Sequence, residues 1–227
     1  MTSIRWVCIS DLHLGALNSL LTNVTQDGER VDGTGPSPVL EALCACMRSL
    51  RQTDQEPPEL VVLGDLFELA LTSPEDAASS FSQFITALRP GMSDAAIAPA
   101  LRFVPGNHDH HLWSRASDDR YLRLLAEGAS AAPTASDRHA THLLPSNDRV
   151  PVRDRFVEIL ASRGDSGTGV TVAQSYPNLG LVTDHGGRSV ILSHGHFIEP
   201  LYRMMSLLDK VFGTPRNGAI EAWQLEA

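Results

Sequence analysis

The sequence predicts a layered α/β domain built around mixed β-sheets. In the first half, short apolar runs rich in strand-forming residues alternate with segments of helical periodicity, which is typical of a parallel sheet with helical crossovers. Nearer the C-terminus three short strands follow one another, and a tight turn is expected to join the last two. Because 227 residues can bury one sizeable core, we expect a single domain over residues 1–227.

Three strands are expected in the first half of the chain. Ile4–Ile9 is a nearly continuous apolar run, as in a strand buried on both faces. Leu60–Leu63 and Leu101–Val104 are similar runs, and each is followed by a glycine and a polar residue within a few positions. Right-handed crossovers would place the C-terminal ends of all three strands at one edge of the sheet, where sites in such sheets lie.

Two helices are expected between these strands. Apolar residues recur at helical spacing over Pro36–Leu50, after a polar, glycine-rich loop at 18–35. A second helix should begin after Ser73, which is followed by a proline and two acidic residues, and run to about Leu88.

The second half has weaker patterns. We expect a variable loop over 114–150, which contains at most a short helix at Tyr121–Ala126. Further elements follow from apolar spacing: a helix at Pro151–Arg163, strands at Val170–Ala173, Gly180–Thr183 and Ser189–Leu192, and an amphipathic helix at Phe197–Phe212.

The composition excludes several classes of protein. The net charge is -9 and no dense run of lysine or arginine occurs, so strong binding to nucleic acid is not expected. The cysteines Cys8, Cys44 and Cys46 lie in apolar surroundings and are expected to be buried, reduced thiols. With no signal-peptide pattern and no transmembrane run, we expect a soluble, cytoplasmic protein; its oligomeric state is not predicted.

Four polar clusters follow apolar runs in the same way, which predicts one site assembled from four loops. They are Ser10-Asp11-Leu12-His13, Gly64-Asp65-Leu66-Phe67-Glu68, Gly106-Asn107-His108-Asp109 and Ser193-His194-Gly195-His196. Mixed carboxylate, amide and imidazole donors suit Mn, Fe, Co or Zn better than Ca. If one carboxylate bridges two such ions roughly 3.5 to 4 Å apart, the pair can clamp a phosphate and generate hydroxide at neutral pH.

These clusters resemble the calcineurin-like metallophosphoesterase superfamily. Its pattern is Asp-x-His, Gly-Asp, Gly-Asn-His-Asp or Glu, a further His, and Gly-His-x-His, and the first four parts occur in order between Ile4 and His196. Gly-Asp-Leu-Phe-Glu and the residues from Gly106 to Trp113 also resemble the branch that contains UDP-2,3-diacylglucosamine pyrophosphatase-like proteins. That branch usually has arginine where this chain has His108.

The resemblance implies an enzyme that hydrolyses a phosphomonoester, phosphodiester or pyrophosphate bond with a hydroxide activated by two divalent ions. Manganese is the first expectation, with Fe, Zn, Co or Ni as alternatives. Asp11 and His13 match ligands of the first ion, Asp65 matches the bridging carboxylate, and Asn107 and His194 match ligands of the second. His108 matches the residue that contacts the phosphate and protonates the leaving oxygen, with Asp109 as its expected partner.

One part of the family pattern is missing. Gly-His-x-His should follow His194, but no histidine occurs after His196. We expect the closing strands and this motif to lie beyond Ala227; the alternatives are that His196, with a carboxylate such as Glu199, takes its place, or that the metals are held weakly. His196 is therefore included among the candidate metal ligands.

Two competing functions remain open at this point. A non-catalytic scaffold that keeps the fold is favoured by the missing motif and opposed by the intact set of candidate ligands. A nuclease is disfavoured by the acidic balance of the chain.

Overall fold

The computed structural model describes residues 4–21, 36–51, 56–128, 142–144, 152–163, 169–182 and 187–196, with residues 204, 207, 208 and 211. Two sheets form its framework. A parallel sheet has the strand order β1-β2-β3-β5, with β1 at Trp6–Ile9, β2 at Glu59–Leu63, β3 at Ala100–Val104 and β5 at Thr171–Gln174. In the second sheet, β6 (Leu179–Val182) lies between parallel β4 (His142–Leu144) and antiparallel β7 (Ser189–Leu192). The predicted α/β class with mixed strand directions is confirmed.

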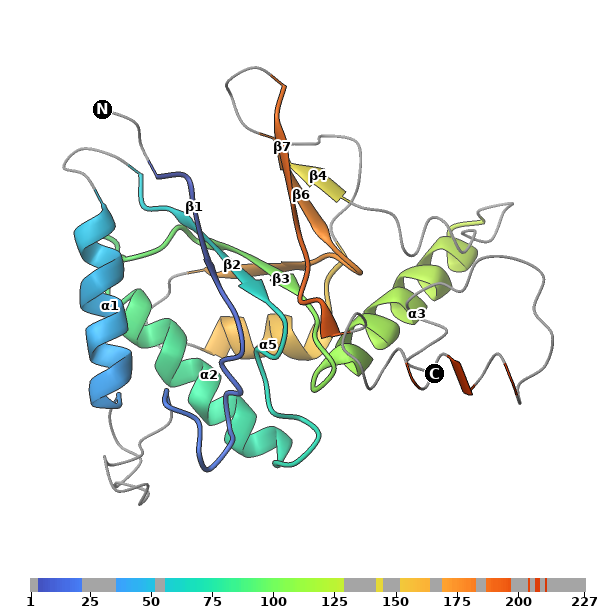
Figure 1. Cartoon of the computed structure of the whole chain (residues 1–227), viewed down its shortest axis with the longest axis horizontal. Helices are drawn as coiled ribbons and strands as arrows, with labels where there is room; N and C mark the ends of the chain where they lie inside the picture. The colour runs from blue at the N-terminus through green and yellow to red at the C-terminus, as the bar shows by residue number, and fades with distance from the viewer. Residues whose placement is uncertain are drawn as a thin grey trace.

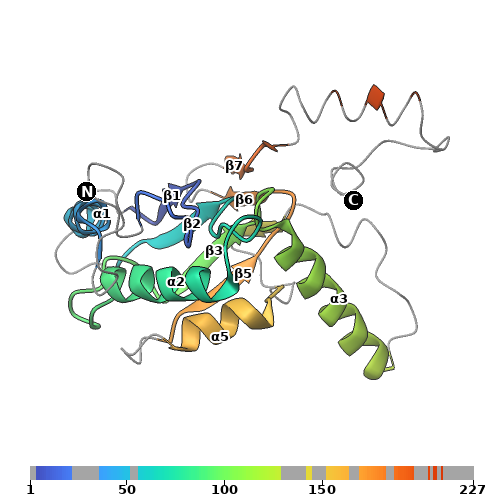
Figure 2. The ribbon, with the colours of Figure 1, turned by 90° about the horizontal axis from the view of Figure 1, so that it is seen from below.

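The parallel sheet is covered on both faces. Helices α2 (Pro74–Leu88) and α5 (Arg155–Arg163) lie against one face, with α1 (Pro38–Leu50) beside α2 (Figure 1). The second sheet lies on the opposite face (Figure 2). Helix α3 (His110–Ala126) leaves the end of β3 and extends away from the sheets.

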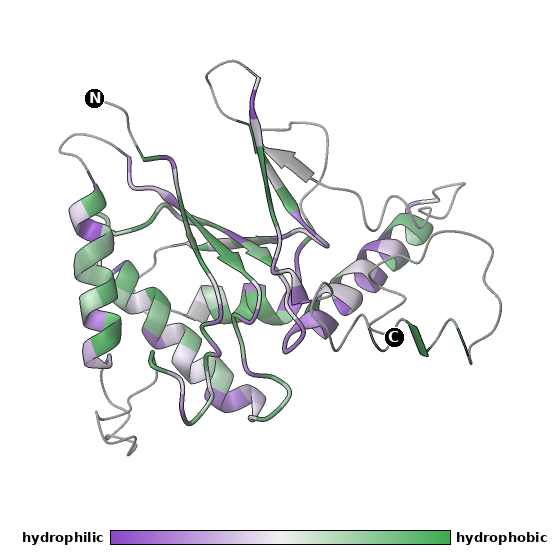
Figure 3. Cartoon of the chain, viewed as in Figure 1, coloured by the Kyte–Doolittle hydropathy of each residue, from purple (hydrophilic) through white to green (hydrophobic). Residues whose placement is uncertain are grey.

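Alternate residues of β2 belong to two different cores. Leu60 and Val62 pack in the large core with the helices, whereas Val61 packs with Leu179 and Leu181 of the second sheet. Successive side chains of a strand point to opposite faces, so a strand between two layers must be apolar throughout. Most residues of β2 and β3 are accordingly apolar (Figure 3), and the two charged ones, Glu59 and Arg102, form an ion pair with each other at 3.1 Å.

Strand β1 departs from the prediction because it is an edge strand. It pairs with β2 only, and Cys8 is exposed rather than buried between two layers. Cys46 on α1 is also exposed, while Cys44 is buried as expected, and all three are free thiols.

The two helices predicted between the first three strands are present, and capping explains where they begin. The Ser37 hydroxyl accepts a hydrogen bond from the Leu40 amide at 3.1 Å, so α1 starts at Pro38, two residues later than expected. The Ser73 hydroxyl accepts from the Asp76 amide at 3.1 Å, and Pro74 is the first helical residue of α2, as predicted.

Helix α3 was not predicted in full. Residues 114–126, expected in a variable loop, belong to this single helix, and the short helix expected at 121–126 is its end. Its buried residues Leu112, Trp113 and Ala116 all lie in the first two turns, and the polar residues at 117–120 separate them from the apolar residues at 121–126, so no continuous apolar stripe runs along the helix. Within 127–150 the structure describes 127–128 and 142–144, where β4 lies; the other residues of that expected loop, and 22–35 of the earlier one, are outside the described residues.

An ion pair with a buried carboxylate lies at the start of α5. Asp154 accepts hydrogen bonds from the Phe156 and Val157 amides at 2.9 and 3.1 Å, and from two guanidinium nitrogens of Arg115 at 2.8 and 2.7 Å. These bonds raise the pKa of the Arg115 guanidinium above its usual value. They also join α5 to α3, although the two helices lie about 30 residues apart in the sequence.

The helix predicted at Pro151–Arg163 is present as α5 but begins at Arg155, four residues later than expected, because Asp154 caps it. Strands β5, β6 and β7 lie within one residue of their predicted bounds, and β6 and β7 are antiparallel. Of the helix predicted at 197–212, the described residues 204, 207, 208 and 211 are helical and the rest lies outside the described residues. In the part of the chain that could be searched, no helix has the length and apolar character needed to span a bilayer.

Candidate metal centre

The loops after β1 and β2 run side by side at the C-terminal edge of the parallel sheet. The His13 amide donates to the Asp65 carbonyl at 2.8 Å, and the Leu14 amide donates to the Leu66 carbonyl at 2.9 Å. The Glu68 amide donates back to the Leu14 carbonyl at 3.1 Å. Strand-like pairing therefore continues beyond the strands and fixes the side chains of these loops relative to one another.

Three candidate ligands have an uncommon backbone conformation. Asp11, His13 and Asp65 have φ values of 56°, 45° and 48°, in the left-handed region that non-glycine residues seldom adopt. Each such residue costs on the order of 1 to 3 kcal/mol, and such strain concentrates at functional sites. The strain therefore singles out the same residues as the sequence motifs.

The Asp65 carboxylate lies at the centre of the cluster. Its Oδ1 accepts a hydrogen bond from the His108 amide at 3.0 Å. Its Oδ2 lies 3.7 Å from Nε2 of His13 and 3.5 Å from Nε2 of His194, too far for a hydrogen bond to either. Two donors that share one ion at bond lengths of about 2.1 Å lie roughly 3 to 3.4 Å apart, so these separations are close to those of a coordination sphere.

The His194 ring is held with one nitrogen available for a ligand bond. Its Nδ1 donates to the Leu63 carbonyl at 2.9 Å, which leaves Nε2 without a proton, 3.3 Å from Oδ1 of Asn107. A Cβ atom at Gly64 would overlap the imidazole ring of His194, and one at Gly106 would overlap the carboxylate of Asp65. Both glycines of the motifs are thus needed for close approach.

The donor atoms of the described residues form two groups that share Asp65. One consists of His13, Asp65 and His108, the other of Asp11, Asp65 and His194, and in each the donor atoms lie within 4.8 Å of one another. Carboxylate and imidazole donors in two groups with a common carboxylate fit a pair of divalent transition-metal ions. Asp11 and His13 fall in different groups, although the resemblance places both on the first ion.

Glu68 joins the two histidines of the first group. Its Oε2 lies 2.9 Å from Nδ1 of His13, and its Oε1 lies 2.7 Å from Nδ1 of His108. Burial favours the neutral carboxyl, but the hydrogen bonds from both rings outweigh it and lower the pKa of Glu68. The sequence interpretation left open whether Glu68 lies behind the metal ligands or on the surface. The structure places it behind the ligands, buried and in contact with both rings.

Asp109 does not have the partner expected for it. Both of its oxygens accept backbone hydrogen bonds, Oδ1 from the Gly106 amide at 2.8 Å and Oδ2 from the Phe67 amide at 3.1 Å. The His108 ring instead bonds to Glu68, so the expected pairing with Asp109 is wrong. Complete burial raises the pKa of Asp109 to about 7, although its backbone hydrogen bonds oppose this shift. Its carboxylate ties the loop after β3 to the loop after β2.

His196 lies beside the cluster. It is buried, and its ring centroid is 5.1 Å from that of His194. It belongs to neither of the two donor groups formed by the described residues. Its assignment as a metal ligand stays a prediction.

The comparison with known families agrees with this geometry. The family model of the calcineurin-like phosphoesterases matches residues 4–224. The chain belongs to the calcineurin-like phosphoesterase family. Neither the curated proteins nor the solved structures searched with this chain gave a match.

Family membership gives the cluster a general chemical meaning. Metal-dependent hydrolysis of phosphate esters is the activity that the calcineurin-like phosphoesterase family indicates, and the two donor groups are where divalent ions would bind.

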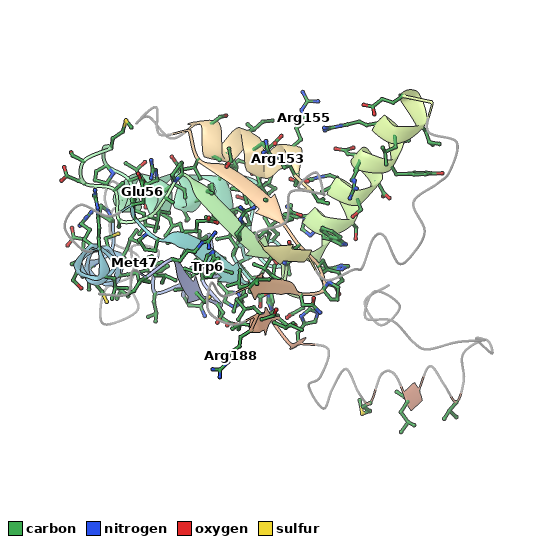
Figure 4. The ribbon with its side chains drawn as sticks, turned by 90° about the horizontal axis from the view of Figure 1, so that it is seen from above. Trp6, Met47, Glu56, Arg153, Arg155 and Arg188 are labelled. Atoms are coloured by element: carbon green, nitrogen blue, oxygen red, sulfur yellow. The ribbon has the colours of Figure 1, made fainter. Side chains whose placement is uncertain are left out.

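Two labelled arginines, Arg155 and Arg188, extend away from the body of the molecule (Figure 4). The side chains that form the donor groups are carboxylates and imidazoles only.

Proposed function

We propose that this calcineurin-like phosphoesterase hydrolyses a phosphomonoester, phosphodiester or pyrophosphate bond at the cluster around Asp65, with two divalent ions. The shared position of Asp65 in both donor groups carries this proposal. A carboxylate can bridge two ions only if donors converge on it from two sides, and the Nε2 atoms of His13 and His194 do so. Asp11 and Asn107 complete the proposed ligand set, and His196 lines it beside His194.

The ions supply charge neutralisation at the phosphate and a hydroxide nucleophile at neutral pH, and manganese is our first choice. The residues of the chain hold the donors at fixed spacing. The amide of His108 orients Asp65, and the Leu63 carbonyl orients His194. Asp109 acts as a positioning residue, because its two backbone hydrogen bonds fix the loop that carries Asn107 and His108.

His108 belongs to the first donor group, but here we assign it to the leaving oxygen, to which it would donate a proton, and not to an ion. Burial alone would lower the pKa of its imidazole, but the hydrogen bond to Glu68 and the charges of Asp65, Glu68 and Asp109 raise it overall. A raised pKa keeps a larger fraction of the ring protonated near neutral pH, as a general acid requires. Bound cations would act in the opposite direction.

The proposal is tested by assaying the chain with aryl phosphate monoesters, diesters and pyrophosphates in the presence of Mn, Co, Ni or Fe. We expect turnover that depends on added metal and that Asp65→Asn abolishes, together with loss of bound metal. Asp118→Asn, an exposed carboxylate on α3, is the matched control and should behave as wild type. Metal-dependent turnover that survives Asp65→Asn would place the activity elsewhere, and a chain that binds metal without turnover would support the scaffold function.

A second variant tests the roles of Glu68 and His108. Glu68→Gln removes the charge that orients His108 and also His13, a proposed ligand, so kcat/KM is compared at a manganese concentration that saturates both proteins. We expect kcat/KM to fall about 10- to 100-fold, the usual range for groups that orient ligands or acids. Unchanged kcat/KM would contradict the role given to the carboxylate.

A further inference from the structure

A cavity of about 620 Å³ opens directly beside the candidate metal centre. Asp11, His13 and Glu68 line one end of it. The remaining wall comes from the end of β1, the segment 18–21, the first turns of α1 and the loop before α2, and it is mainly aliphatic: Leu12, Leu20, Leu21, Val39, Leu43 and Leu71. Its volume lies within the range of small-molecule sites.

The rim of this cavity exposes aliphatic side chains to solvent. Leu20 is 70 % exposed and Leu71 is 81 % exposed, and Val39 is 45 % exposed. Large aliphatic side chains gathered around an opening are unfavourable in water unless a ligand covers them. Because the same opening contains Asp11 and His13, a ligand that covers these side chains can also reach the metal centre.

The side chains of the cavity exclude several kinds of ligand. Among the described residues that line it there is no lysine or arginine, which an additional phosphate would need. There is also no phenylalanine, tyrosine or tryptophan among them on which a nucleic-acid base could stack. The Ser19 hydroxyl donates to the Leu12 carbonyl and accepts from the Leu21 amide, so it is already engaged within the wall.

We propose that the substrate is a phosphate ester with an aliphatic substituent, and that this cavity holds the substituent while the phosphate lies at the metal centre. The proposal rests on the proposed function, since it assumes that the phosphate binds beside Asp11 and His13. It names a substrate class, the amphiphilic phosphate esters, over nucleotides.

The test uses two series of substrates with alkyl groups from methyl to octyl: alkyl phosphates, assayed by phosphate release, and alkyl 4-nitrophenyl phosphates, assayed by nitrophenol release. Each methylene that enters an apolar site should raise kcat/KM of the manganese-loaded chain by up to about fourfold, until the cavity is filled. Similar kcat/KM for methyl and octyl esters would overturn the inference and leave the proposed function intact.

Binding of the non-hydrolysable alkylphosphonates, measured by calorimetry, gives a readout that does not need turnover. We expect affinity to increase with chain length in the same way. If affinity increases while no ester is hydrolysed, the cavity assignment stands and the proposed function fails. Equal affinity for methyl- and octylphosphonate overturns the assignment.

Variants of exposed residues localise the effect without disturbing the core. Leu20→Asn and Leu71→Asn should lower the ratio of kcat/KM for the octyl ester to kcat/KM for the methyl ester. Leu122→Asn is the matched control, because this leucine is 61 % exposed on α3 and does not line the cavity. Val39→Trp should fill the cavity and reduce turnover of the octyl ester more than that of the methyl ester. A chain-length dependence that the three cavity variants share with wild type would overturn the assignment.

A further assay distinguishes a soluble substrate from a lipid in a bilayer, because both can carry a phosphate ester with an aliphatic group. Octyl phosphate in solution and a long-chain phosphatidate in phosphatidylcholine vesicles present the same ester with an aliphatic group. Preference for the first indicates a soluble amphiphile, and preference for the second indicates a lipid taken from a bilayer.

Discussion

Asp65 shows how a single side chain can be fixed from several directions. One of its carboxylate oxygens is held by the amide of His108, and its own carbonyl accepts from the amide of His13. The second oxygen faces the Nε2 atoms of two histidines. Because the contacts on Asp65 are largely backbone contacts, the position of the proposed bridging ligand depends little on side-chain rotamers elsewhere.

Gly64 allows a substitution that separates steric displacement from backbone strain. A Cβ at this position would overlap the His194 ring, and its φ of 82° is unfavourable for alanine. We expect Gly64→Ala to displace His194 and to reduce metal affinity and kcat/KM about 10- to 100-fold. Both are measured on the purified chain, by metal titration and by ester hydrolysis.

Gly128→Ala is the control for this variant. Gly128 has a φ of 79°, but a Cβ there meets no atom within 4 Å. It should lose a similar amount of stability and keep its metal affinity. If the two variants lost metal affinity equally, the His194 contact would not be the cause.

For individual residues, the sequence predicted which side chains come together at the site better than it predicted which of them form hydrogen bonds with one another. Asp11, Asp65 and His194 were predicted because residue type and position after a strand both follow from ligand chemistry. The pairing of His108 with Glu68 was not, because it depends on the path of the loop after β2 and on the left-handed turns at His13 and Asp65. Asp109 was expected to pair with His108, its neighbour in the sequence. In the structure its buried carboxylate accepts hydrogen bonds from backbone amides instead.

The helices differ in how strongly the sequence predicts them. A serine cap and a proline at the first position made α2 predictable, since both act within a few residues. The fully buried residues of α3 lie at its beginning, where the Trp113 ring lies 5.8 Å from that of Tyr176, more than 60 residues away in the sequence. A contact so distant in sequence leaves no local periodicity to detect.

The start of α5 makes a prediction about stability. Asp154 is 1 % exposed and combines a helix cap with a bidentate bond to Arg115. Removing both in Asp154→Ala should lower the free energy of unfolding by about 2 to 3 kcal/mol, from the lost cap and the lost charge-assisted hydrogen bonds. Urea unfolding measures this difference.

Ser73→Ala removes a comparable cap that is exposed to solvent. It should cost about 1 kcal/mol, because water replaces the lost hydrogen bond. Equal losses in the two variants would show that the link between α3 and α5 adds nothing to stability.

The whole molecule places its site where three layers of structure meet. Strand β2 packs against the helices through Leu60 and Val62, and against the second sheet through Val61. His194 follows β7 of the second sheet and bonds to the carbonyl of Leu63 on β2. The spacing of the donor atoms in the candidate metal centre therefore depends on the relative position of the two sheets.

Metal binding should stabilise the entire fold for this reason. An ion at about 100 times its Kd adds about 2.7 kcal/mol to the free energy of unfolding, which for a chain of this size raises Tm by roughly 5 to 10 °C. We expect manganese to raise Tm and a chelator to reverse the change. Thermal unfolding followed by circular dichroism measures both.

Asp65→Asn is the decisive control for this measurement. If it abolishes the change in Tm, the stabilisation comes from the cluster around Asp65. A change of the same size in the variant would mean that manganese stabilises the chain from another place.

The left-handed conformations of Asp11, His13 and Asp65 have a consequence for how such a sequence changes over generations. Glycine adopts this conformation without strain, so exchange to glycine at any of the three would relieve the backbone while it removed a metal donor. At these positions natural selection for stability and natural selection for ion binding act in opposite directions. In a copy of the gene that is no longer selected for ion binding, glycine would be favoured at these three positions. Substitution to glycine there is therefore a sensitive sign that selection for ion binding has ended.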